Sequence, residues 1–178
     1  IGKEYGDVSG AMESIELVRG ELAEGSSADS MIDGLFSAFI RSSREFEEKY
    51  VRETSIVQTS TFEVTLESPR ELRGIMFYNS NSDETAFESV KNIAFLCEEN
   101  GKEKVYVIPE LKYSYDCNHI FNEVSENYYI IFGGGCYAEF ASLSNVKAIR
   151  FTVEVPEGKE SVGVAEVALV GRFANAQG

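Results

Sequence analysis

The sequence predicts an all-β chain folded as an antiparallel β-sandwich or barrel. Short apolar segments of strand length recur along the 178 residues with turn signals between them, and no long amphipathic helix interrupts them. The chain holds 12 Phe and 9 Tyr but no Trp, an aromatic content that favours sheets over helical bundles. Hydrophobic residues make up 43% of the chain, which is enough for one domain with a full core.

Alternation of apolar and polar residues identifies most of the expected strands. Phe62, Val64 and Leu66 would face the core, while Glu63 and Thr65 would face water. The last apolar segment is apolar on both faces apart from one glutamate, as in a central strand. We expect about eight strands, at residues 14–19, 61–66, 72–78, 92–97, 104–108, 128–132, 148–155 and 162–170.

Turn residues and charges separate these strands. Pro69 is expected to close the second strand, and Asn100-Gly101 is typical of a two-residue hairpin. Residues 42–53 are densely charged and have a capping-box spacing, which indicates a short surface helix or a long charged loop. A single helical turn is expected at 86–91.

Composition also bounds the domain and its partners. We expect a leader or linker at 1–13, one β-sandwich at 14–172 and a tail at 173–178. The formal net charge of −14, with no basic patch, argues against nucleic acid as a partner. No apolar segment approaches the roughly 18 residues of a membrane span, so we expect no membrane insertion.

The three cysteines are too few for a disulfide scaffold. A single disulfide between Cys117 and Cys136 would leave Cys97, which follows an apolar segment and is interpreted as a small core residue. No Cys-x-x-Cys pair or histidine cluster indicates zinc or redox chemistry.

Two stretches at opposite ends of the chain carry a family resemblance. Ala28 and the segment 31–34 (Met-Ile-Asp-Gly), with Ser42 as a closing serine, form the first, and 148–151 with 163–171 form the second. In this order and spacing they resemble the discoidin family, also called the factor V/VIII type C domain. The resemblance covers roughly residues 14–172 and implies a galactose-binding-domain-like, antiparallel jelly-roll β-sandwich of about eight strands, with short helical turns in its loops.

This chain departs from the family pattern beside the Asp-Gly turn. Leu35 stands at the family's acidic position, Ala38 at its Thr and Ile40 at its Trp. The segments 43–60 and 110–127 are also longer than in the family. These departures weaken a direct transfer of any known mode of ligand binding.

The resemblance implies a structural calcium ion, because many relatives hold one at the Asp-Gly loop near the late glutamate. Asp33 and Glu166 are the side chains retained here that would bind it, together with backbone carbonyls of residues 31–37. The alternative is that Asp33 only forms an Asx-type turn before Gly34 and that Glu166 pairs with an arginine. No other cofactor is expected.

Sugar-binding relatives use loops at one end of the sandwich, where an aromatic ring stacks on the sugar and polar groups bind its hydroxyls. The loop at 113–121 is the richest candidate, and Asn79 begins a second polar loop. The alternative is that the tyrosines cover the sheet as ordinary half-buried aromatics. The expected ligand-binding residues are Tyr113, Tyr115, Asp116, Asn118, His119 and Asn79.

The sequence therefore predicts a secreted or cell-surface binding module without catalytic activity, most consistent with carbohydrate binding. Its alternative is a protein-interaction or adhesion module of the same fold, so the expected partner is a glycan or a cell-surface protein. Catalysis is not expected, because the only histidine, His119, follows Cys117 at a spacing of two with no oriented base and oxyanion site indicated.

Overall fold

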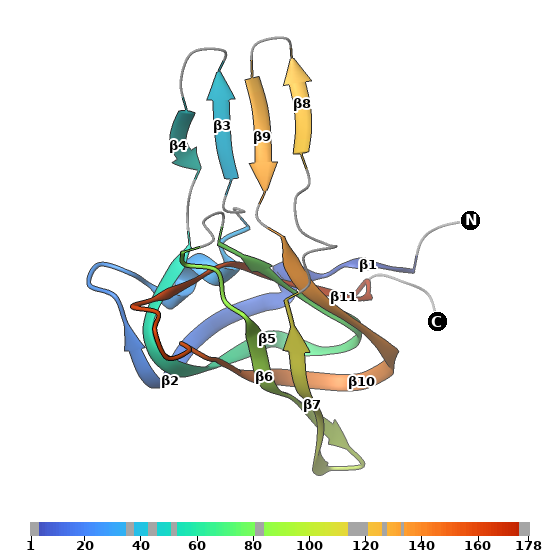
Figure 1. Ribbon diagram of the computed structural model, residues 1–178. Coiled ribbons are helices and arrows are strands. Elements are labelled where there is room, and N and C mark those ends of the chain that lie inside the picture. Colours follow the sequence, from blue (N-terminus) through green and yellow to red (C-terminus); the bar gives the residue numbers. More distant parts are fainter. Residues whose placement is uncertain are drawn as a thin grey trace.

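The computed structural model describes residues 4–34, 38–42, 46–50, 53–80, 84–113, 121–125, 128–132 and 134–174. Figure 1 shows a molecule built of strands, with short 3-10 helices in its loops. The elements are, in chain order, β1 (Tyr5–Asp7), η1 (Ser9–Ala11), β2 (Met12–Leu22), η2 (Ala28–Ile32), β3 (Ala38–Ser42), β4 (Phe46–Tyr50), β5 (Thr54–Asn79), β6 (Ser89–Glu99), β7 (Lys102–Lys112), β8 (Phe121–Ser125), β9 (Tyr128–Phe132), β10 (Gly135–Val153) and β11 (Val162–Arg172). This confirms the all-β class.

The strand β5 organises the larger sheet, which has the order β1-β11-β5-β10-β6-β7 with β2 also paired to β5. Both ends of β5 meet β11 at one place, because Val164 lies opposite Thr54 and also opposite Asn79. β5 therefore curves around the core, as Figure 1 shows. Two expected strands, 61–66 and 72–78, are arms of this one strand. Pro69 is exposed between them and does not end the strand.

The core lies inside this curved sheet. Phe62 and Phe77, from the two arms of β5, pack on Phe151 of β10 with ring centroids 5.5 and 4.9 Å away. All three rings are fully buried. Burial of Phe62, Val64 and Leu66 follows the expected alternation, since Thr65 is exposed. Aromatic side chains of this size contribute much of the apolar area that stabilises a sandwich.

A second, four-stranded sheet has the order β4-β3-β9-β8 and stands out from the sandwich (Figure 1). It combines two segments that are distant in the sequence, since Ala38 of β3 lies opposite Phe132 of β9. The expected helix or charged loop at 42–53 is wrong, because β4 occupies Phe46–Tyr50. The stretch 110–127, in which no strand was expected, contains the end of β7 and all of β8.

One further expectation differs from the structure. The helical turn at 86–91 is wrong, because β6 begins at Ser89 and Val90 pairs with Leu111. Within the expected leader at 1–13, Tyr5 of β1 lies opposite Arg172 of β11. The hairpin at Asn100-Gly101 is confirmed, and both residues have positive φ, 54° and 74°. Cys97 is buried in the core as expected.

Candidate functional site at the loop end of the sandwich

Backbone contacts bring the candidate loops to one end of the sandwich. The Asn79 N–H donates to the Gly134 carbonyl at 2.6 Å, which joins the end of β5 to the approach to β10. The Gly163 N–H donates to the Thr85 carbonyl at 2.7 Å, which joins the start of β11 to the loop after β5. The segments carrying β3–β4 and β8–β9 leave the sandwich at this end (Figure 1). We call it the loop end.

Glycines permit this close packing of strands. A Cβ added at Gly135 would lie 2.3 Å from the Phe77 carbonyl oxygen, a distance that no side chain tolerates. A Cβ at Gly163 would lie 2.6 Å from a carboxylate oxygen of Glu53. The glycine at 135 therefore has a physical reason, because the backbone of β5 approaches too closely for any other residue.

Asn79 lies in the interior of the loop end. Its side chain is fully buried, and its Nδ2 donates to the Phe87 carbonyl at 2.9 Å. Its Oδ1 accepts from the backbone N–H groups of Ser80 and Phe87, both at 2.8 Å. The amide therefore holds the loop between β5 and β6 in place. This position differs from the ligand-facing one expected, because the hydrogen-bonding atoms of the side chain are used on the protein backbone.

Tyr113 marks the start of the aromatic loop. Its ring packs edge-on against Phe87, with centroids 6.2 Å apart, and its N–H donates to the Glu88 carbonyl at 2.8 Å. The side chain is half-buried at the margin of the core. Its packing is that of a half-buried aromatic, and its contact with a ligand stays a prediction. The other expected residues of this loop, Tyr115, Asp116, Asn118 and His119, lie outside the described residues, and so does Cys117, whose pairing with Cys136 the sequence leaves open.

Asp33 and Glu166 come together beside the loop end. Gly34 has φ of 79°, which suits glycine, and its N–H donates to Glu166 Oε2 at 2.9 Å. Glu166 is 2% exposed, and its other oxygen, Oε1, has no hydrogen-bond partner among the described residues. The expected arginine partner of Glu166 is not found in the described part of the chain, where the carboxylate lies against the Gly34 backbone and near Asp33.

Burial raises the pKa of Glu166 to about 8. The Gly34 N–H opposes this rise, while the carboxylates of Asp33 and Asp7 reinforce it. Burial therefore favours the protonated form of this carboxyl near neutral pH. Among the described residues, no group of three or more His, Cys, Asp or Glu side chains could hold a metal ion, so a cation here needs backbone oxygens as well.

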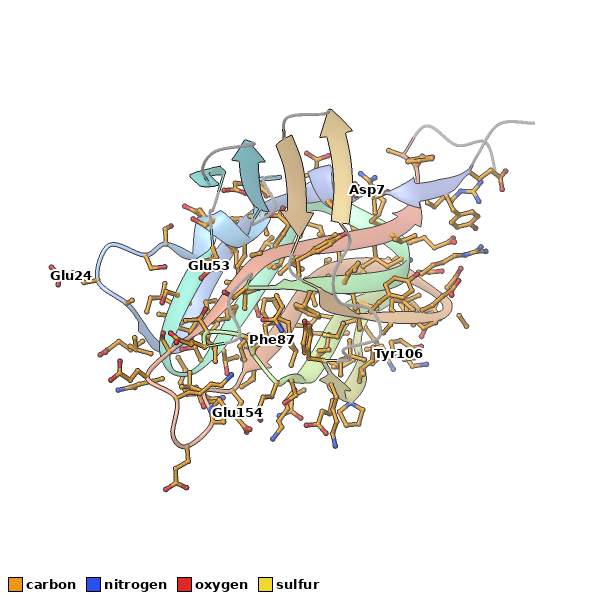
Figure 2. The ribbon with its side chains drawn as sticks, turned by 45° about the horizontal axis from the view of Figure 1, so that its top comes forward. Asp7, Glu24, Glu53, Phe87, Tyr106 and Glu154 are labelled. Carbon is orange, nitrogen blue, oxygen red and sulfur yellow. The ribbon has the colours of Figure 1, made fainter. Side chains whose placement is uncertain are left out.

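A polar cluster at this end was missed by the sequence analysis. The Ser80 hydroxyl donates to Glu53 Oε1 at 3.3 Å and shares a hydrogen bond of 2.6 Å with the Thr85 hydroxyl. Figure 2 shows Glu53 at the foot of the projecting strands, with Phe87 within the sandwich. These residues come from three separate segments that carry no common motif. The only sequence signal was the polar character of the residues after β5.

Comparison with known proteins identifies the fold. No protein-family model matches the sequence, and no curated protein matches it. The family 32 carbohydrate-binding module of C. perfringens NanJ, solved in complex with galactose, is similar, with a TM-score of 0.57 at 14% identity over 93% of this chain and 98% of that one. The F5/8 type C domain of a Bacteroides fragilis protein has a TM-score of 0.58 at 14% identity, over 96% and 99%.

The lectin domain of lectinolysin, solved with the Lewis B antigen, has a TM-score of 0.51 at 13% identity, over 90% of this chain and 93% of that one. These matches extend over nearly the whole chain and nearly the whole of each matched domain. The chain therefore has the fold of the F5/8 type C and family 32 carbohydrate-binding domains, the galactose-binding-domain-like jelly-roll sandwich that its sequence motifs resemble.

Proposed function

We propose that this chain is a non-catalytic carbohydrate-binding module, secreted or displayed at a cell surface, which binds its sugar at the loop end. The observation that carries the proposal is that described residues bordering the candidate loops meet at one end of this fold. Three of these segments, at 35–52, 81–85 and 114–133, start or finish beside residues joined by the contacts of Asn79, Ser80 and Gly163. Domains of similar fold were solved with galactose and with the Lewis B antigen.

The proposal can be tested by glycan-array screening followed by calorimetry with the sugars that bind. We expect Tyr115→Ala to weaken binding about tenfold or more, because an aromatic ring at the centre of a binding site is typically an energetic hot spot. Tyr106→Ala is the matched control, since Tyr106 is 37% exposed on β7, away from the loop end. Tyr113→Phe tests the hydroxyl of Tyr113 while it preserves the packing on Phe87. Equal sugar affinity for the Tyr115 variant and the wild type would reject the assignment of this loop.

A second candidate, a cell-surface protein partner, is favoured by one observation. In the described part of the chain, β4 and β8 each pair on one side only, so the projecting sheet has two edges with open backbone groups. Such edges accept a strand from a partner protein. Capture of one defined protein by the wild-type chain, with no signal on the glycan array, would support this candidate over sugar binding.

We also propose that the Asp33–Glu166 pair holds calcium. The support is Glu166 Oε1, which is buried, lacks a hydrogen-bond partner among the described residues and lies on a carboxylate close to Asp33. Carboxylate oxygens are the ligands that calcium prefers. The two side chains would bind the ion, and the ion would supply a structural link between the loop after η2 and β11. Calcium calorimetry on metal-stripped protein tests this, and no heat together with no shift in melting temperature would reject it.

A further inference from the structure

A cavity lies away from the loop end, beside the bend of β5 and the end of β11. Its volume is about 310 Å³, and Ser68, Pro69, Arg70, Glu71, Arg172 and Phe173 contribute to its lining. Arg172 lies opposite Tyr5 of β1, so the cavity is on the side of the sandwich where β1 meets β11 (Figure 1). This volume falls at the lower end of the range of small-molecule sites.

The two arginines in this cavity are largely buried but weakly paired. The Arg70 side chain is 12% exposed, and its closest ion-pair contact joins Nη2 to Glu67 Oε1 at 3.8 Å. The Arg172 side chain is 22% exposed, and its Nη2 lies 3.8 Å from Glu4 Oε1. Distances of 3.8 Å are too long for hydrogen bonds. A guanidinium carries five N–H donors, and removing such a charge from water is costly unless an anion or other acceptors compensate it.

The two arginines have N–H donors without an acceptor among the described residues. Arg172 Nη1 donates to the Tyr5 hydroxyl at 3.3 Å, while Arg172 Nη2 is buried and has no hydrogen-bond partner among the described residues. No hydrogen bond from Arg70 to another described residue is present. The opposing charge in the lining, Glu71, is already engaged, because its Oε2 accepts from the Ser142 hydroxyl at 3.0 Å.

The charges around the cavity favour an anion of low charge. Arg70 and Arg172 face Glu71 in the lining, and Glu67 and Glu4 each lie 3.8 Å from one of the arginines. These carboxylates repel a dianion more strongly than a monoanion. Carboxylates match the fork of a guanidinium with two parallel hydrogen bonds. Pro69 and Phe173 add apolar surface on which one face of a sugar ring can pack.

We propose that this cavity is a second binding site, specific for a carboxylate-bearing sugar such as a hexuronic acid, with Arg70 and Arg172 as the partners of the carboxylate. The hydroxyls of the sugar would meet Ser68 and Glu71. The site is separate from the loop end, so its existence does not depend on sugar binding there. A chain with both sites would bind a glycan at two places and gain avidity when both are engaged.

Calorimetry at low ionic strength with glucuronate and galacturonate tests the proposal, with galactose, acetate and inorganic phosphate as comparison ligands. We expect the uronates to bind and Arg70→Gln to weaken them about ten- to a hundredfold, since hydrogen bonds to charged groups contribute about 1.5–3 kcal/mol. Arg70→Lys should restore part of the affinity, because it keeps the charge but loses the fork. Arg150→Gln is the matched control, as Arg150 is an exposed arginine paired with Glu63 at 2.9 Å.

The outcomes separate the two sites. Loss of uronate binding in Arg70→Gln with an unchanged melting temperature supports the cavity, whereas Tyr115→Ala should leave uronate binding here intact. Equal uronate affinity in Arg70→Gln and the wild type would overturn the proposal. Acetate or phosphate binding as tightly as the uronates would overturn the sugar assignment. Failure of galactose to bind anywhere would count against the loop end alone.

Discussion

Replacing Glu166 with Gln tests whether burial raises the pKa of this carboxyl. Glutamine has nearly the same shape, so its carbonyl oxygen accepts from the Gly34 N–H as Glu166 Oε2 does at 2.9 Å. It cannot ionise, and it is a weaker calcium ligand than a carboxylate. The substitution therefore removes the proton equilibrium and one proposed metal ligand while it preserves the packing of β11.

The magnitude follows from the raised pKa of Glu166. Its pKa is about 8 in the folded chain and 4.5 at its ordinary value. At 1.36 kcal/mol for each pKa unit, this difference corresponds to at most about 5 kcal/mol. Because the folded-state pKa is raised, the contribution is fully present below pH 4.5 and is lost as the pH rises through 8. Without calcium, the free energy of unfolding of the wild type should therefore fall across this window more steeply than that of Glu166→Gln.

The assay is urea unfolding at several pH values between 5 and 8, in a chelator and then with calcium. In the chelator the Glu166→Gln protein should be the more stable one near pH 8, and added calcium should stabilise only the wild type. Glu157→Gln is the control, because Glu157 is exposed on a turn. Parallel loss of stability in the wild type and Glu166→Gln as the pH rises would refute the reasoning, since the buried carboxyl would then have no special proton affinity.

Three further substitutions test the packing at the loop end and in the core. Asn79→Ala removes three hydrogen bonds to the buried backbone of the loop after β5 and should lower the free energy of unfolding by about 3 kcal/mol in urea titrations, whereas a surface polar contact would cost under about 1 kcal/mol. Gly135→Ala places a methyl group against the Phe77 carbonyl, so soluble expression or the melting temperature should drop sharply; an unchanged melting temperature would show that β5 and β10 are further apart. Phe151→Ala empties the centre of the core and should cost about 3–5 kcal/mol by thermal or urea unfolding, with a loss near 1 kcal/mol contradicting its central position.

Local patterns were sufficient for most of the sandwich. Alternation in the β5 and β10 segments marks side chains that the structure buries, such as Phe62 and Phe151. The apolar character of the last strand indicated a central position, and β11 does lie between β1 and β5. The continuity of β5 through Pro69 was missed, because a proline at an exposed bend needs no backbone N–H and does not interrupt a strand that changes direction there.

Contacts between distant segments could not be predicted from local patterns. The Gly34–Glu166 hydrogen bond closes a separation of 132 residues, and only the family resemblance suggested that these stretches lie together. Asn79 is a residue type that is common in ligand-binding loops. Its burial depends on hydrogen bonds to the Phe87 backbone, and no local pattern in the sequence indicates those bonds. The cavity lined by Arg70 and Arg172 lies between the bend of β5 and the end of β11, so its two arginines are distant in the sequence.

The projecting sheet forms from two segments that are distant in the sequence and that both leave the sandwich at the loop end. Strand β3 follows Gly34 by a few residues and β9 ends just before Gly134, and both anchors are held on the sandwich through Glu166 and Asn79. Anchoring removes much of the chain entropy that pairing two distant segments would otherwise cost. Each segment forms a hairpin, and β3 then pairs with β9 over five residue positions. The same two contacts therefore hold the chain just before β3 and just after β9 on the sandwich, at the end from which the projecting sheet extends.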